Sequence, residues 1–137
     1  MLYITKLTPV SGGIIKLEIG KSRFFLEPAF CIKSGFSAGC EISDEQLEQI
    51  QYEAQRTKIK QRAAYYVSLR PYSKVELERK LKQKFREHEL IREAILRLDE
   101  LNLLDDKAVT EFVTELMIRR RQGVNRIKAK LQEKGIS

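Results

Sequence analysis

Basic side chains with helical spacing are the residues of this chain that could do the most specific chemistry. Arg79, Lys82 and Arg86 recur at intervals of three and four, which places them on one side of a helix, and Arg126 with Lys130 repeats this spacing further along. Guanidinium and ammonium groups arranged in this way can bind phosphate oxygens or the carboxylates of an acidic protein surface. The alternative is a solvated helix face, which is the ordinary role of any single Lys.

The wider set of candidate contact residues is basic and lies in the C-terminal part of the chain. Residues 1–57 carry 6 basic and 7 acidic side chains and residues 58–137 carry 20 and 12, so the whole net charge of +7 comes from the second part. We find no set of side chains that would distinguish bases, so a DNA contact is expected to be electrostatic and sensitive to salt. The predicted contact residues are Arg70, Lys74, Arg79, Lys82, Arg86, Arg119, Arg120, Arg121, Arg126 and Lys130.

Other residues that could carry chemistry are better explained by structural roles. Tyr65, Tyr66 and Tyr72 could stack on bases, but we favour core or staple positions for them. Asp105 and Asp106 look like a paired carboxylate, yet neighbouring residues at a helix start point in different directions, which favours N-capping.

Metal, redox and cofactor chemistry find no support in the sequence. The single His88 and the two cysteines, Cys31 and Cys40, form no cluster with zinc-ligand spacing, and we expect a solvated imidazole and reduced thiols. Gly12-Gly13 with Lys16 lacks the Gly-Lys-Ser/Thr ending of a phosphate-binding loop. The chain is therefore expected to be a non-enzyme without catalytic residues, cofactor, metal or small-molecule substrate. Because no apolar stretch approaches the about 18 residues of a membrane span and the start lacks a signal peptide, we expect a cytoplasmic protein without a membrane partner.

The first part of the chain has the composition of strands and turns. Ser11-Gly12-Gly13 and Gly20-Lys21-Ser22 predict turns between short apolar segments, which indicates an antiparallel sheet within a small strand-rich segment, residues 1–42. The predicted strands are Tyr3–Thr8, Ile14–Ile19, Arg23–Glu27 and Phe30–Lys33.

From residue 43 the apolar period changes from two to about 3.6, which is typical of helices. Ser43-Asp44-Glu45-Gln46 predicts a capping box that begins a helix from about Asp44 to Leu69, with a possible interruption near Thr57. The apolar stripe of residues 43–57 is discontinuous, which favours a connecting helix over a core element.

A second capping box, Ser73-Lys74-Val75-Glu76, begins the next helix, and the apolar stripe from Ile91 to Leu101 predicts a third. Residues 58–102 can therefore close a three-helix bundle, and residues 103–137 follow with two further helices, the first capped at Asp105 or Asp106.

An internal repeat with an offset of 50 links these helices. It pairs Ser73 with Gly123, Leu77 with Ile127, Lys80 with Lys130 and Leu81 with Leu131, together with Tyr66 and Leu116, Arg70 and Arg120, and Lys84 and Lys134. The expected fold is mainly α with a small N-terminal antiparallel β segment, α+β overall, with one complete three-helix repeat and a second that lacks its third helix.

Three segments of the sequence carry a family resemblance: residues 66–81 (YVSLRPYSKVELERKL), 101–106 (LNLLDD) and 123–136 (GVNRIKAKLQEKGI). They are similar to segments of the RecX family of bacterial regulators of the RecA recombinase, and the specific part of the resemblance spans residues 63–136. The resemblance implies a modular helical protein that sits in the groove of the RecA filament on DNA and inhibits filament growth, ATP hydrolysis and strand exchange. Members usually have three repeats, so this chain departs from the family by ending within the second.

Two alternatives to a filament regulator stay open. A basic three-helix bundle is also typical of helix-turn-helix DNA-binding proteins, which would be compact dimers with a sequence preference. The missing third helix leaves room for a truncated, inactive paralogue. The repeat favours the filament regulator, with the RecA filament as its protein partner and direct, non-specific DNA contact as a possible addition.

Overall fold

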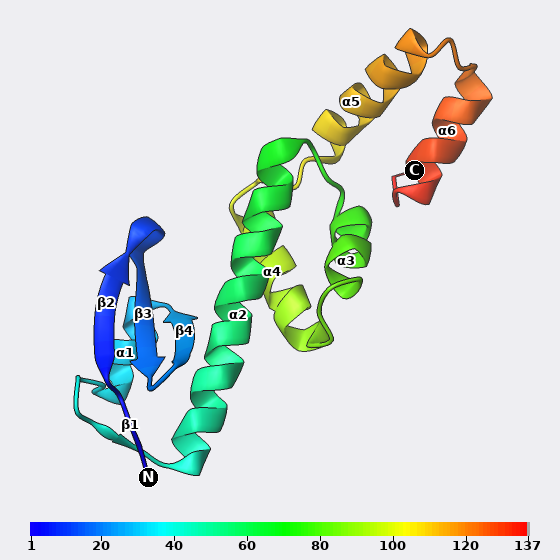
Figure 1. Ribbon diagram of the computed structural model, residues 1–137. Coiled ribbons are helices and arrows are strands. Elements are labelled where there is room, and N and C mark those ends of the chain that lie inside the picture. Colours follow the sequence, from blue (N-terminus) through cyan, green and yellow to red (C-terminus); the bar gives the residue numbers. More distant parts are fainter. Residues whose placement is uncertain (137) are drawn as a thin grey trace. The chain divides into compact units, whose positions relative to one another are not determined.

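The computed structural model describes residues 1–136, which divide into one compact unit of residues 1–58 and another that begins at Ile59. Helix α2 (Asp44–Leu69) contributes its first part to one unit and its last part to the other. Six helices and a small N-terminal antiparallel sheet among these residues confirm the predicted mainly helical fold (Figure 1). Within residues 1–136, no helix combines the length and apolar character needed to cross a membrane.

The N-terminal unit is built on an antiparallel sheet of three strands, β2 (Lys6–Val10), β3 (Ile14–Ile19) and β4 (Ser22–Leu26). Leu17 at the centre of β3 lies opposite Leu7 on one side and Phe24 on the other. A separate ladder joins β1 (Leu2–Tyr3) to β5 (Glu41–Ile42). The predicted strand Tyr3–Thr8 is therefore wrong as one element. Its start belongs to β1, which pairs with β5, and its end belongs to β2, which pairs with β3.

The predicted strand Phe30–Lys33 is also wrong, since these residues belong to helix α1 (Pro28–Ser34). Pro28 stands in the first helical turn, where its fixed φ favours a helix and its missing N–H costs nothing. Gly35 ends the helix in the left-handed region at φ 69°, and its N–H donates to the carbonyl of Ile32. Both local signals were present in the sequence.

Helix α2 begins with the predicted capping box. The amide of Gln46 donates to Oγ of Ser43 at 3.1 Å, and the amide of Ser43 donates to Oε1 of Gln46 at 2.9 Å. The predicted interruption near Thr57 is wrong, because α2 is one continuous helix there, and the Thr57 hydroxyl donates to the carbonyl of Glu53 one turn earlier. Residues 43–57 also contribute to a hydrophobic core, since Ile50 is fully buried in the N-terminal unit.

The core of the helical unit lies between the last part of α2, α3 (Lys74–Lys82) and α4 (His88–Glu100). Tyr66 and Tyr72 are buried in it, which confirms their predicted core roles, whereas Tyr65 is 52% exposed and does not fit that prediction. This core consists of Ile59, Ala63, Tyr66, Tyr72, Leu77, Leu81, Phe85, Leu90, Ile91, Ala94, Ile95, Leu98 and Leu104.

Two further helices follow, α5 (Asp106–Arg119) and α6 (Val124–Glu133). Asp105 caps α5, because its carboxylate accepts from the amide of Lys107 at 2.9 Å. Gly123 precedes α6 as Ser73 precedes α3, while the tandem repeat itself stays a prediction. A third apolar cluster joins the buried Val109, Val113 and Ile136 to the half-buried Phe112, Met117 and Leu131.

Candidate functional site

The ten predicted contact residues lie on helices α3, α5 and α6 and on the turns that adjoin them. Arg70 follows α2, Arg120 and Arg121 follow α5, and Lys74 opens α3. Arg86 does not share a helix side with Arg79 and Lys82, because α3 ends at Lys82. The amide of Lys84 bonds to the carbonyl of Leu81, three residues back, and this tighter turn ends the helix before Arg86.

Arg70 is held in place by an acidic and an aromatic neighbour. Its two terminal nitrogens donate to the two carboxylate oxygens of Glu76 at 3.1 and 2.9 Å, which is the bidentate geometry that suits a guanidinium. The Arg70 guanidinium carbon also lies 3.8 Å from the centre of the Tyr72 ring. The hydrogen bonding of Arg70 to the Glu76 carboxylate is the main reason that the pKa of Arg70 lies above its ordinary value.

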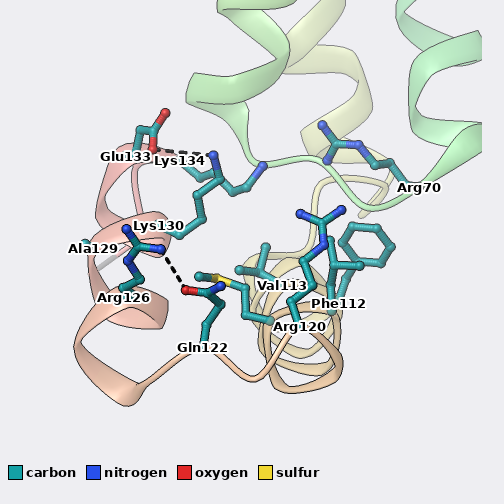
Figure 2. A pocket seen from close by; sticks show the side chains of 12 residues that line it. Arg70, Phe112, Val113, Arg120, Gln122, Arg126, Ala129, Lys130, Glu133 and Lys134 are labelled. Atoms are coloured by element: carbon teal, nitrogen blue, oxygen red, sulfur yellow. Dashed lines mark hydrogen bonds and ion pairs between the residues drawn. The ribbon is translucent and has the colours of Figure 1, made fainter.

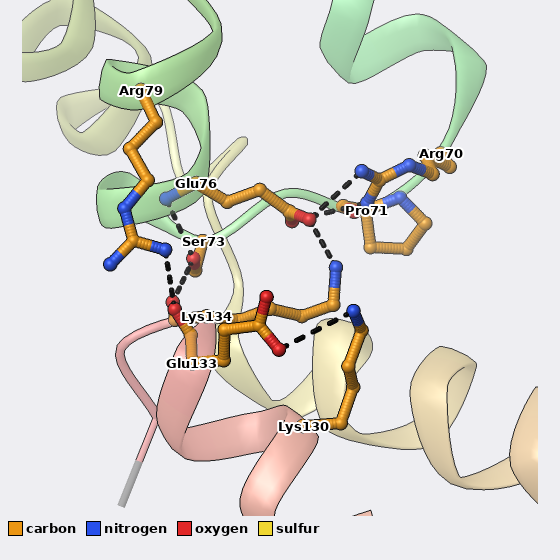
Figure 3. Close-up of polar contacts among 8 residues, drawn as sticks. All are labelled: Arg70, Pro71, Ser73, Glu76, Arg79, Lys130, Glu133 and Lys134. Carbon is orange, nitrogen blue, oxygen red and sulfur yellow. Dashed lines mark hydrogen bonds and ion pairs between the residues drawn. The ribbon is translucent and has the colours of Figure 1, made fainter.

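Glu76 also forms an ion pair with Lys134, 58 residues away in the sequence (Figure 3). Burial by itself would raise the pKa of Glu76, but the hydrogen bonds and positive charges of Arg70 and Lys134 outweigh it. The pKa of Glu76 therefore lies below its ordinary value, and its carboxylate joins two cations from distant parts of the helical unit.

The same contacts join the start of α3 to the end of α6. The Ser73 hydroxyl donates to the carbonyl of Lys134 and accepts from the amide of Glu76, and Arg79 donates to the carbonyl of Glu133 at 2.6 Å (Figure 3). These last carbonyls of α6 have no partner within their own helix, so α3 supplies them with donors. We call this set of contacts the α3–α6 junction: Arg70, Ser73, Glu76, Arg79, Glu133 and Lys134.

Gly135 allows the end of α6 to come close to α3 at this junction. Its φ is 83°, in the left-handed region, and a Cβ built there would lie 2.6 Å from Cγ2 of Val75. A side chain at this position would therefore meet both backbone strain and a steric clash.

Several of the other predicted residues have partners on the protein surface. Lys74 pairs with Asp99 at 2.8 Å, and Lys82 pairs with Glu78 at 2.9 Å. Further along, Arg119 pairs with Glu115, Arg126 bonds to the side-chain amide of Gln122, and Lys130 lies 3.5 Å from Glu133. Exposed ion pairs contribute at most about 1 kcal/mol, so an external anion can replace them at small cost.

Three of the predicted cations stand apart from these pairs. Arg86, Arg120 and Arg121 are exposed, and among residues 1–136 none of them has an ion pair or hydrogen bond through its side chain. Arg120 also lines a cavity of about 590 Å³ with residues of α5 and α6, and Arg126 and Lys130 line it too (Figure 2). The structure thus gathers Arg70, Arg120, Arg126 and Lys130 around one cavity and leaves the remaining predicted residues elsewhere.

Sequence reasoning missed the roles of Glu76 and Lys134. The sequence pattern predicts only a capping-box role for Glu76, but its carboxylate accepts from Arg70 and Lys134 and not from the Ser73 amide. Lys134 appeared only in the repeat alignment. No local signal identifies either role, because the pair spans 58 residues.

His88, Cys31 and Cys40 are the remaining side chains that could carry chemistry. His88 is exposed at the start of α4, and Cys31 and Cys40 are free thiols, of which Cys31 is buried with its pKa raised by that burial. Within residues 1–136, no three His, Cys, Asp or Glu residues are arranged to hold a metal ion.

Comparison with curated proteins identifies relatives that share one name. The chain is 36% identical over 115 residues to "Regulatory protein RecX" of Halalkalibacterium halodurans, a match that covers 83% of this chain and 43% of the relative. It is 44% identical over 68 residues to the protein of the same name from Chlorobaculum tepidum, covering 49% of this chain and 42% of the relative. The match to the Streptococcus uberis protein of that name is 37% identical over 125 residues and covers 90% and 48%.

A solved structure shares the fold. The crystal structure of a regulatory protein RecX superimposes with a TM-score of 0.70 and 21% sequence identity, covering all of this chain and 69% of the other. No protein-family model matches the chain. The matched regions span less than half the length of the curated relatives. Taken with the residues quoted from the sequence, these similarities place the chain in the RecX family.

Proposed function

We propose that this chain is a cytoplasmic regulatory protein of the RecA recombinase, without enzymatic activity of its own. It binds the RecA–DNA filament and inhibits filament growth, ATP hydrolysis and strand exchange. The observation that carries the proposal is the 36–44% identity to proteins named regulatory protein RecX. The RecA partner and the mode of inhibition come from the family resemblance of residues 63–136.

The charge distribution supports a polyanionic partner. Residues 58–137 carry 20 basic and 12 acidic side chains, and Arg86, Arg120 and Arg121 are exposed cations. A RecA filament on DNA offers phosphate and carboxylate groups along its length, and these can bind such cations without any reading of base sequence. The surface pairs of Lys74, Lys82 and Arg119 can open to add three more contacts.

Co-sedimentation tests the proposed partner directly. The chain is mixed with RecA filaments assembled on single-stranded DNA, with the same DNA alone and with duplex DNA, at about 0.05 and 0.15 M salt. We expect the chain to pellet with filaments at both salt concentrations and to bind bare DNA weakly and only at the lower one.

Two results would contradict the proposal. Tight binding to duplex DNA without RecA, with preference for one sequence, would assign the chain to the helix-turn-helix class of DNA-binding proteins. No binding to filaments or to DNA would indicate an inactive paralogue.

A further inference from the structure

The ring of Tyr65, near the end of α2, is open to solvent, unlike that of its neighbour Tyr66. Tyr65 is 52% exposed, whereas Tyr66 is 6% exposed and belongs to the core of the helical unit. The two ring centres lie 6.0 Å apart with their planes tilted by 50°, so a fixed ring backs the exposed one. Tyr65 therefore contributes little to the core and keeps much of its ring surface available for a planar ligand.

Arg62 places a cation beside both rings. It lies one helical turn before them, and its guanidinium carbon is 5.9 Å from the centre of the Tyr65 ring and 5.9 Å from that of Tyr66. A cation at this distance from an aromatic ring is attracted by the negative charge of the ring face. The contact holds the guanidinium beside the exposed ring while its N–H groups can still donate to an anion.

Lys80 of α3 brings a second cation to the same place. Its ammonium lies 5.7 Å from the centre of the Tyr66 ring. Lys80 adjoins Leu81 and follows Leu77 by three positions, and both leucines are buried in the core that α3 shares with the last part of α2, which lies beside it (Figure 1). Arg62 and Lys80 therefore come from different helices and approach one ring. We call this set of residues the Tyr65 patch: Arg62, Tyr65, Tyr66 and Lys80.

The two cations of the Tyr65 patch are not neutralised by the protein. Among residues 1–136, neither Arg62 nor Lys80 has an ion pair or a hydrogen bond with an acidic side chain. Lys74, also on α3, differs from them because it pairs with Asp99 at 2.8 Å. Two like charges beside one ring repel each other, so both favour an anion bound next to them.

We propose that the Tyr65 patch binds single-stranded nucleic acid, with one base stacked on Tyr65 and the adjacent phosphates on Arg62 and Lys80. An exposed aromatic ring next to cations is the arrangement by which proteins hold single strands without reading their sequence. A duplex keeps the faces of its bases stacked inside, so it offers phosphates to the patch but no base to Tyr65. An acidic protein surface also suits the cations, but a carboxylate gives the ring no planar partner.

The site lies outside the ten predicted contact residues, since neither Arg62 nor Lys80 is among them. The inference deepens the proposed function, on which it rests for the source of the strand, the DNA of the RecA filament. The binding itself needs no RecA, so it can be measured with this chain and a free strand.

The test measures fluorescence anisotropy of a labelled single strand of about 20 thymidines added to the full chain, at about 0.05 M salt. We expect Tyr65→Ala to weaken binding about tenfold, because one stacked base is lost. Tyr65→Phe keeps the ring and should change binding less than about twofold. The matched control is Tyr3→Ala, which removes a 45% exposed ring from the N-terminal unit and should also have less than about a twofold effect. Circular dichroism checks that each variant is folded.

The cations have their own matched pair. Lys80→Gln should weaken binding about threefold and reduce the slope of log affinity against log salt by about 0.7, the value for one phosphate contact on a single strand. Lys107→Gln removes an exposed lysine from the start of α5, outside the patch, and should leave this slope unchanged. A duplex of about 20 base pairs should bind at least about threefold more weakly than the single strand, and Tyr65→Ala should abolish that preference.

Several results would overturn the inference. They are no binding of the single strand at about 0.05 M salt, tighter binding of the duplex, equal effects of Tyr65→Ala and Tyr65→Phe, and equal effects of Lys80→Gln and Lys107→Gln. Labelled poly-glutamate that binds as tightly as the single strand, with equal sensitivity to Tyr65→Ala, would also overturn it and would assign the patch to an acidic protein.

RecA-dependent ATP hydrolysis is measured separately with the same variants, which separates this inference from the proposed function. Binding of the strand that depends on Tyr65, without any effect of the chain on hydrolysis, would remove the proposed function and keep the site. Inhibition of hydrolysis by a chain that does not bind the strand would keep the proposed function and remove the site.

Discussion

The carboxylate of Glu76 accepts hydrogen bonds from both terminal nitrogens of Arg70, six residues earlier in the chain, at 3.1 and 2.9 Å. The same carboxylate pairs with Lys134, so one acidic side chain holds two cations, of which Arg70 is a predicted contact residue and Lys134 is not. The Glu76 side chain is 15% exposed and that of Lys134 is 14% exposed, which shields their ion pair from solvent. Glu76 therefore links the start of α3 to the end of α6.

Replacing Glu76 tests the strength of this link. We expect Glu76→Gln to lower the free energy of unfolding by about 1–3 kcal/mol, because Arg70 and Lys134 lose the charge that compensates their partial burial. Urea unfolding followed by circular dichroism measures the change. The control is Glu78→Gln, whose exposed pair with Lys82 should contribute less than about 0.5 kcal/mol. Equal losses in the two variants would show that Glu76 has no special role.

The same carboxylate predicts how stability depends on pH. Because folding lowers the pKa of Glu76 from its ordinary value of 4.5, its contribution is present above that pH and is lost as the pH falls through the lower folded value. The difference in unfolding free energy between the unaltered chain and Glu76→Gln should therefore be constant from neutral pH to about pH 5 and shrink below 4.5. Urea titrations across this range measure it. A difference that grows on acidification would contradict the assigned ion pairs.

Gly135 predicts a backbone effect at the α3–α6 junction. Gly135→Ala should destabilise the helical unit by about 1–3 kcal/mol, because the new Cβ meets Val75 and φ is positive. Hydrogen exchange should show faster exchange of the Ile136 amide, which bonds to the carbonyl of Leu131. The double variant with Val75→Ala removes the clash and should recover part of the loss; no loss in the single variant would show that α6 does not dock closely on α3.

The basic residues of α3 predict a loss of binding without a loss of fold. Arg79→Glu with Lys82→Glu should leave the helical circular dichroism spectrum nearly unchanged, because both side chains are exposed, although Arg79 also loses its hydrogen bond to the Glu133 carbonyl in the α3–α6 junction. Binding to RecA filaments should weaken at least about fivefold, roughly 1 kcal/mol, and depend less on salt. Lys6→Glu with Lys21→Glu, in the N-terminal unit, makes the same charge change as a control. An unfolded α3 variant, or equal weakening by the control, would show that the contact face lies elsewhere.

Helix caps that are formed by neighbouring residues could be predicted from the sequence. The capping box of Ser43 and Gln46 and the cap at Asp105 follow from side chains within three positions of their amides. The strand predicted at Phe30–Lys33 is wrong because Pro28 and Gly35 begin and end a helix there, although the residues between them are largely apolar. The sequence therefore contained the residues that decide this element.

Long-range contacts could not be predicted in the same way. The ion pair of Glu76 with Lys134 joins residues 58 positions apart and depends on how the helices pack. The ten predicted contact residues were chosen by charge and spacing alone, which says nothing about partners across the fold. The structure adds that Arg70 and Arg79 are engaged in the α3–α6 junction and that Arg120 and Arg126 line a cavity.

The most direct test of the central claim is RecA-catalysed ATP hydrolysis on single-stranded DNA, with this chain added at concentrations well below that of RecA. A filament regulator should slow hydrolysis at such ratios, because one bound chain affects many filament subunits, and the effect should persist at about 0.15 M salt. The result that would contradict the account is hydrolysis unchanged even when the chain is in excess of RecA.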